Sequence, residues 1–141
     1  MRTTSLLLVA AILTSASPAV MAQGQAPQEQ GNLQVQINAA QISARAASRN
    51  IFEMSEIHRR LQSSINCLVG PKDPDFSAEA PNPCASTGNG VIPDHPDAGR
   101  KARYREAVTR LKAVMAMEDR KQAMEAALET ADMIAAISEG N

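Results

Sequence analysis

Residues 33–69 read LQVQINAAQISARAASRNIFEMSEIHRRLQSSINCLV, and their apolar spacing is the strongest structural signal in the chain. Steps of four and three alternate without interruption along one seam, whose members are Leu33, Ile37, Ala40, Ala44, Ala47, Ile51, Met54, His58, Leu61, Ile65 and Leu68. Such spacing is typical of a helix that packs like a coiled coil. No Gly or Pro falls before Gly70 and Pro71, so we expect one helix over 33–69.

A second apolar track predicts another long helix over residues 98–138. Asp94 is a suitable N-cap, Pro96 fits a first turn, and Asp97 sits where a capping box places an acid. The track is irregular near its centre, where two steps of three follow each other and Lys121 interrupts it. Its members are Tyr104, Ala107, Leu111, Val114, Met117, Met124, Leu128, Ala131 and Ala135.

Between the two helices, residues 70–97 contain six prolines, and we expect no regular element there. Two long helices joined by such a loop predict an all-α antiparallel hairpin, in one domain over residues 33–141. Several apolar residues lie off the main seams and need cover, namely Ile42, Phe52, Ile57, Val108, Met115 and Met133. We therefore expect a homodimer that completes a four-helix bundle, with packing by the loop as the alternative.

The beginning of the chain has the features of a secretion signal. Arg2 precedes an apolar run over residues 6–13, and Val20-Met21-Ala22 suits cleavage after Ala22. We expect a signal peptide over 1–22, a flexible tail over 23–32, and a periplasmic or secreted mature protein without a transmembrane segment.

The two cysteines, Cys67 and Cys84, agree with this location. An even number of cysteines in an oxidising compartment predicts a disulfide, which would pin the first half of the loop to the end of the first helix. Their spacing is too wide for a redox CxxC pair, and a metal site would need further ligands nearby.

Composition and motifs argue against several classes of function. Without Arg2, 13 basic residues face 15 acidic ones, which is too nearly neutral for a nucleic-acid partner. The chain has two Phe, one Tyr and no Trp, little aromatic surface for a substrate pocket. We find no nucleophilic triad, phosphate loop or haem-attachment motif, so we expect no enzyme, no catalytic residue and no cofactor.

A basic cluster is the best candidate for partner binding. Cations crowd the first turns of the second helix, where they oppose the helix dipole, and the hairpin would bring two more to the same end. The set is Arg59, Arg60, Arg100, Lys101, Arg103 and Arg105. One interpretation is that the acidic loop (Asp73, Asp75, Glu79, Asp94 and Asp97) folds over the cluster, and the other is that an acidic protein surface or anionic lipid binds it.

Histidines and methionines offer a second kind of site. His58 is the one ionisable residue in the first seam, and it is either a half-buried structural histidine, a metal ligand or a pH switch. Thioethers can bind cuprous ion, but the methionines follow the packing tracks, so core filling explains them better and no metal site is assigned. His95, between an Asp and a Pro, is expected to be a solvated turn residue.

These expectations favour a non-enzymatic helical interaction protein, such as an accessory subunit of an envelope or secretion assembly, whose protein partner the sequence does not identify. The alternatives are a periplasmic metal- or small-ligand-binding helical bundle and a chaperone-like hairpin. A shared helical shape does not decide among them.

Overall fold

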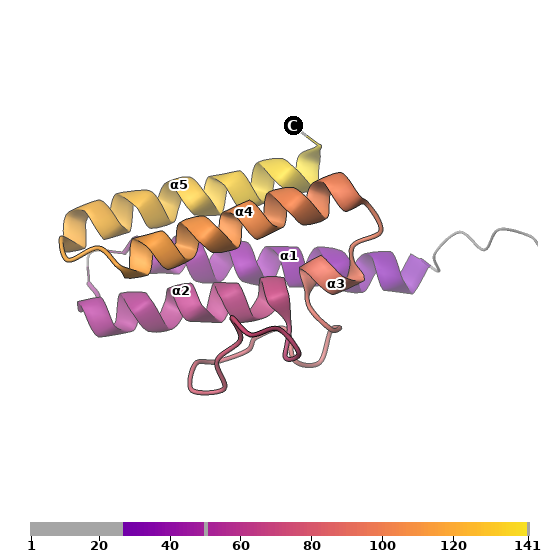
Figure 1. The fold of residues 1–141 in the computed structure, drawn as a ribbon, viewed down its shortest axis with the longest axis horizontal. Helices are drawn as coiled ribbons and strands as arrows, with labels where there is room; N and C mark the ends of the chain where they lie inside the picture. Colours follow the sequence, from indigo (N-terminus) through magenta and orange to yellow (C-terminus); the bar gives the residue numbers. More distant parts are fainter. Residues whose placement is uncertain (1–26, 50, 141) are drawn as a thin grey trace, which may run out of the picture.

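The computed structural model describes residues 27–49 and 51–140, which form five helices and no strand (Figure 1). The helices are α1 (Pro27–Ala47), α2 (Met54–Val69), α3 (Val91–Asp94), α4 (Ala98–Met115) and α5 (Arg120–Glu139). The predicted all-α class is confirmed for this part of the chain. The proposed signal peptide over 1–22 and its cleavage site lie outside the described residues.

The four long helices form a bundle within one chain. Successive helices run antiparallel, and α4 and α5 lie as a layer over α1 and α2 (Figure 1). Each long helix packs mainly against two others, since α1 packs against α2 and α5, and α4 packs against α5 and α2. The chain thus supplies all four helices that we expected from two copies of a hairpin.

The expected single helix over 33–69 is wrong, because the helical structure is interrupted at residues 48–49 and 51–53. The Ser48 hydroxyl donates to the Arg45 carbonyl oxygen at 2.8 Å, and the chain turns back before α2 begins after Glu53. Ile51, which the seam placed in the core, is 74% exposed in this turn. The fold-back lets α1 and α2 bury their apolar faces against each other, which one straight helix could not do.

The expected helix over 98–138 is also two helices. Its turn comes after α4 ends at Met115, and the Asp119 carboxylate caps α5 by accepting from the Gln122 backbone N–H at 2.8 Å. Asp97, rather than Asp94, is the N-cap of α4 and accepts from the Arg100 N–H at 2.6 Å. Gly140 ends α5 in the left-handed region, with φ of 84°.

The expected flexible tail over 23–32 is corrected in its second part, because α1 already begins at Pro27. Proline suits a first helical position, since its φ is fixed near the helical value and its missing N–H would have had no partner there. The Gln and Glu residues after it are good helix formers.

The core lies between the two layers and is closed within the chain. Ile57 and Val108, which we expected a second copy to cover, are 0% and 1% exposed. Alanines dominate the buried faces of α1 and α5, and large side chains from α2 and α4 lie in the same core. The buried alanines of these two helices are Ala40, Ala44, Ala47, Ala123, Ala127 and Ala131. Two of the off-seam residues are therefore covered within one chain, whereas Ile42 is 66% exposed.

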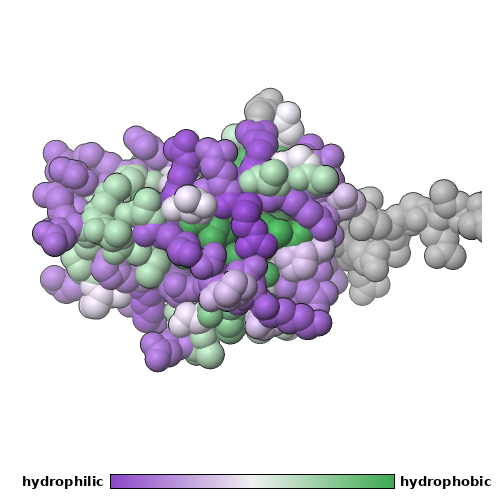
Figure 2. Space-filling view, in the orientation of Figure 1, coloured by the Kyte–Doolittle hydropathy of each residue, from purple (hydrophilic) through white to green (hydrophobic). Residues whose placement is uncertain are grey.

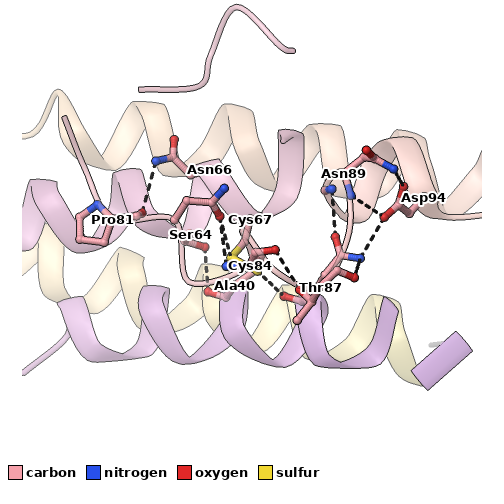
Figure 3. Close-up of a disulfide and its surroundings, with 12 residues drawn as sticks. Ala40, Ser64, Asn66, Cys67, Pro81, Cys84, Thr87, Asn89 and Asp94 are labelled. Carbon is pink, nitrogen blue, oxygen red and sulfur yellow. Dashed lines mark hydrogen bonds between the residues drawn. A yellow bond between two sulfur atoms is a disulfide. The ribbon is translucent and has the colours of Figure 1, made fainter. Parts of the chain in front are cut away.

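The predicted disulfide between Cys67 and Cys84 is present and buried (Figure 3). Beside it, the buried Asn66 side chain donates to the Ser77 carbonyl oxygen at 2.8 Å and accepts from the Ser77 N–H at 3.0 Å. Backbone groups of the loop are thus satisfied by side chains of α2 instead of by a regular element.

The end of the loop contains a short helix, α3, where we expected none. Pro93 is tolerated in it because only its first turn exists, where a missing N–H costs nothing. The backbone at the start of the loop packs closely against the backbone just before α3. A Cβ on Gly70 (φ 75°) would lie only 1.6 Å from the Asn89 carbonyl oxygen. Only glycine allows that approach.

Candidate functional site

An open groove of about 510 Å³ lies between the loop, α3 and the first turns of α4. In Figure 2 this face shows strongly hydrophobic side chains over the α3 region, ringed by hydrophilic ones. The groove is lined by Val69, Lys72, Asp73, Asn89, Ile92, Pro93, Asp94, Lys101 and Arg105.

The floor of the groove is apolar and nearly buried. Val69 ends α2 and is 3% exposed, while Ile92 lies in α3 and is 7% exposed. They are brought together because Gly70 and Gly90, which lie close to them in the chain, approach each other closely. Each side chain keeps a small part of its surface toward the groove, where an apolar group could cover it.

The rim carries charges of both signs, but its carboxylates accept hydrogen bonds from groups of the protein itself. Asp94 accepts from the Asn89 N–H at 2.8 Å, the Asn89 side chain at 3.0 Å and Gln36 Nε2 at 3.0 Å (Figure 3). Desolvation raises the pKa of Asp94, but these hydrogen bonds and Lys101 outweigh it and leave that pKa below its usual value. Asp94 is therefore ionised at neutral pH and already has its donors.

The carboxylate of Asp73 likewise accepts hydrogen bonds from groups of the protein itself. It accepts from Arg105 Nη1 at 2.7 Å and from the Asp75 N–H at 3.0 Å. Desolvation raises the pKa of Asp73. The two hydrogen bonds and the charges of Arg105 and Lys112 lower it by more, so the pKa of Asp73 lies below its usual value. Lys101 Nζ donates to the Pro93 carbonyl oxygen, and Lys72 has no ion pair within the described part of the chain. The groove therefore presents two ammonium groups that form no ion pair with a described carboxylate, although the charge of Lys101 acts on nearby Asp94.

The expected six-residue basic cluster is not assembled. Arg59 and Arg60 lie near the start of α2, in the half of the bundle opposite to the start of α4. Both form ion pairs with Glu56, at 2.7 and 2.8 Å, and the Arg60 guanidinium lies 4.5 Å from the centre of the Phe52 ring. The expected placement of Arg59 and Arg60 beside the start of α4 was wrong because it relied on a hairpin of two unbroken helices, whereas partner binding by these residues stays a prediction.

The other four members stay together on α4. Arg105 pairs with loop residue Asp73, and Lys112 further along α4 pairs with Asp75, so the acidic loop does bind part of this helix. Arg100 and Arg103 form no ion pair with any described residue, and Lys101 lines the groove. The loop therefore neutralises one cation of this group and leaves the first turn of α4 basic.

His95 was expected to be solvated, but it is 5% exposed behind the groove. Its Nδ1 accepts from the Asp97 N–H at 3.0 Å, and its ring centre lies 5.8 Å from that of Tyr104. Burial, with Arg100 as the next contribution, lowers the pKa of His95. Burial also raises the pKa of Tyr104 to about 12. Both rings are structural supports for the start of α4.

The groove combines apolar, cationic and carboxylate side chains. Among the described residues, no three His, Cys, Asp or Glu side chains converge on a possible metal position, and none of their helices is long and apolar enough to cross a membrane. No family model, curated protein or solved structure matches the chain.

The sequence analysis found two cations of this site, Lys101 and Arg105, and missed Lys72 and the apolar floor. Val69 and Ile92 are separated by the whole Pro-rich loop, and no spacing rule connects them. The glycines close to them, Gly70 and Gly90, were the available signal, since paired glycines can mark a close backbone approach.

Proposed function

We propose that this chain is a non-enzymatic extracytoplasmic binding protein that holds an acidic segment of another protein in the groove. The observation that carries the proposal is the apolar floor of Val69 and Ile92 beside Lys72 and Lys101, neither of which forms an ion pair with a described carboxylate. A segment with one aliphatic side chain between two carboxylates matches this arrangement, because the side chain covers the floor while the carboxylates meet the ammonium groups.

Two further features support this function. The groove is open and shallow, which suits a protein segment better than a small substrate that must be enclosed. The buried disulfide that ties the loop to α2 suits an oxidising compartment, where an accessory subunit of an envelope or secretion assembly would work.

The test uses fluorescence anisotropy with three labelled peptides of about twelve residues. One carries a leucine between two aspartates, one carries lysines in place of the aspartates, and one carries alanine in place of the leucine. We expect saturable binding of the first peptide only, with an affinity that falls as salt is raised. Binding of the lysine peptide with equal affinity would contradict the proposal.

The matched variants reverse charge inside and outside the groove. Lys72→Glu with Lys101→Glu should weaken binding at least tenfold, about 1.4 kcal/mol. An acid in the first turn of α4 also agrees with the helix dipole, so this variant should fold. Lys121→Glu with Arg110→Glu reverses two exposed cations that the groove does not include, for the same change in net charge, and should bind like the parent protein. Equal loss in both variants would mean that net charge alone drives binding.

A further inference from the structure

Asn89 and Gly90 form the one Asn–Gly pair in the sequence, and they lie just before α3, where Asn89 lines the groove. An Asn–Gly pair is prone to deamidation, because a glycine has no side chain to keep its backbone nitrogen from reaching the asparagine Cγ. Asn89 is exposed, so the water that the reaction consumes has access to it. The pair is therefore a candidate modification site.

Deamidation of this pair takes two steps. The Gly90 nitrogen attacks Cγ of Asn89, loses its proton to solvent and expels the side-chain nitrogen as ammonia, which leaves a cyclic imide. Water then opens the imide at one of its two carbonyl carbons. The product is aspartate, or isoaspartate in which the backbone runs through the former side chain, and both carry a negative charge that asparagine lacks.

The closed loop holds both reacting groups in other contacts. The Gly90 N–H is buried and donates to Gln36 Oε1 at 3.0 Å, so the attacking nitrogen is occupied. The Asn89 side chain donates through Nδ2 to Asp94 at 3.0 Å, and the Asn89 backbone N–H donates to the same carboxylate at 2.8 Å (Figure 3). These contacts must break before the imide can form, which requires local opening of the loop.

Neither product fits the closed loop. Aspartate at position 89 would place a carboxylate where Nδ2 now donates to Asp94, and two like charges at that distance repel each other. Isoaspartate would lengthen the backbone where there is no room for it, because a Cβ added to Gly90 would already lie 2.6 Å from the Gly70 nitrogen. The loop that opened to allow the reaction could therefore not close again over either product.

We propose that Asn89 is a deamidation site that the closed loop protects, and that its conversion to a carboxylate holds the loop open permanently. Opening is reversible while the amide is intact and irreversible once ammonia has left. The new charge would also lie on the rim of the groove that Lys72 and Lys101 line, where it would oppose an acidic segment. This last consequence alone rests on the proposed function.

The first experiment compares the folded and the unfolded protein. The disulfide-intact chain is incubated in mildly alkaline buffer with and without guanidinium chloride, and the tryptic peptide over residues 73–100 is then analysed by mass spectrometry. Fragmentation assigns the loss of the amide to Asn89 or to Asn82. We expect Asn89 to react at least about tenfold more slowly in the folded protein, because only its open fraction reacts. Equal rates in the two states would overturn the proposal.

The second experiment releases the reacting groups within the folded protein. Gln36→Leu removes the acceptor of the Gly90 N–H, and Asp94→Ala removes the acceptor of both Asn89 donors. Each should raise the rate of deamidation toward that of the unfolded chain, whereas Gln34→Leu, which changes an exposed residue of α1, should not. Two different variants are used so that a folding defect in one leaves the other to decide. An unchanged rate in both would contradict the protection by the loop.

The third experiment tests the product by hydrogen exchange of the Gly90 amide, a measurement that does not depend on any ligand of the groove. Asn89→Asp carries the charge of one product and should speed this exchange at least about tenfold. Asn38→Asp adds the same charge at an exposed position of α1 and should leave the exchange unchanged. Exchange in Asn89→Asp as slow as in the parent protein would show that the loop closes over the product, and the proposal would fail.

Discussion

Gln36 of α1 accepts a hydrogen bond of 3.0 Å from the backbone N–H of Gly90, the residue that precedes α3. Its side-chain amide also donates to the Thr87 carbonyl oxygen at 3.2 Å and to Asp94 at 3.0 Å. Gln36 is 0% exposed, so one buried side chain fixes the end of the loop, the start of α3 and one wall of the groove. This polar contact couples the bundle to the proposed binding surface.

Replacing Gln36 with Leu should therefore destabilise the protein and loosen the groove. The Gly90 N–H and the Thr87 carbonyl would lose their partner, and we expect a loss of about 2–3 kcal/mol in the free energy of unfolding. Urea denaturation measures it. Gln34→Leu is the control, because Gln34 is exposed and its hydrogen bonds join surface side chains, so the change should be within about 0.5 kcal/mol. Similar losses in both variants would remove the special role of Gln36.

The disulfide should stabilise the fold mainly through the loop. Cys67 and Cys84 are both buried, so the native protein should show no thiol that reacts with a labelling reagent. The variant with Ala at both positions should lose about 3 kcal/mol by the loop-entropy argument. Limited proteolysis should then cut within residues 70–90 while the helical circular dichroism signal persists. Two reactive thiols in the native protein would contradict this prediction.

Acid should destabilise the protein through His95. Burial lowers its folded pKa below the unfolded value of about 6.5, so the unfolded chain takes up the proton first as the pH falls. Stability is then full above about pH 6.5 and declines below it. His95→Asn keeps an acceptor near the Nδ1 position for the Asp97 N–H and removes the titration. Thermal melts between pH 5 and 8 should show a flatter profile in this variant, and an unchanged decline would assign the effect to another group.

The sequence predicted the buried faces of the helices better than their ends. Ala40, Ala44, Leu61, Ile65 and Leu68 were all read from the seam and are buried. The turn at 48–53 could not be read, because the steps of four and three continue through it and no Gly or Pro marks it. In such a case the break is decided by tertiary packing, which lets both halves bury their apolar faces.

The turn between α4 and α5 has a signal in the sequence that the apolar spacing alone did not identify as a turn. Two steps of three after Leu111 and the interruption at Lys121 flank the turn, and Asp119 is a good N-cap for α5. For the site, composition found Lys101 and Arg105, but their neighbours Val69 and Ile92 meet only through the path of the loop. Long-range contacts of this kind have no local signature.

The closed core predicts a monomer, against our expectation from the sequence. Ile57 and Val108 are buried inside one chain, so the apolar surface that a dimer was to cover is already covered. Of the off-seam residues, Ile42 alone is strongly exposed, at 66%. The exposed large apolar side chains among the described residues are Val35, Ile42, Ile51 and Leu128, which lie on α1, the turn before α2 and α5. Four such side chains cover less area than a stable dimer interface requires. Light scattering at micromolar concentration should give the mass of one chain, and the mass of two would restore the dimer.

Asp119 should be necessary for the turn between α4 and α5. Its carboxylate accepts from the Gln122 N–H, and Asp119→Ala should cost about 1 kcal/mol of stability through the lost cap. Alanine also favours a continuous helix, so this variant should form some domain-swapped dimer, in which α4 and α5 join straight across the turn. Asp119→Ser keeps a capping oxygen and should stay monomeric with nearly the parent stability. Urea denaturation and size-exclusion chromatography at rising concentration test both effects, and equal behaviour of the Ala and Ser variants would show that the cap does not hold this turn.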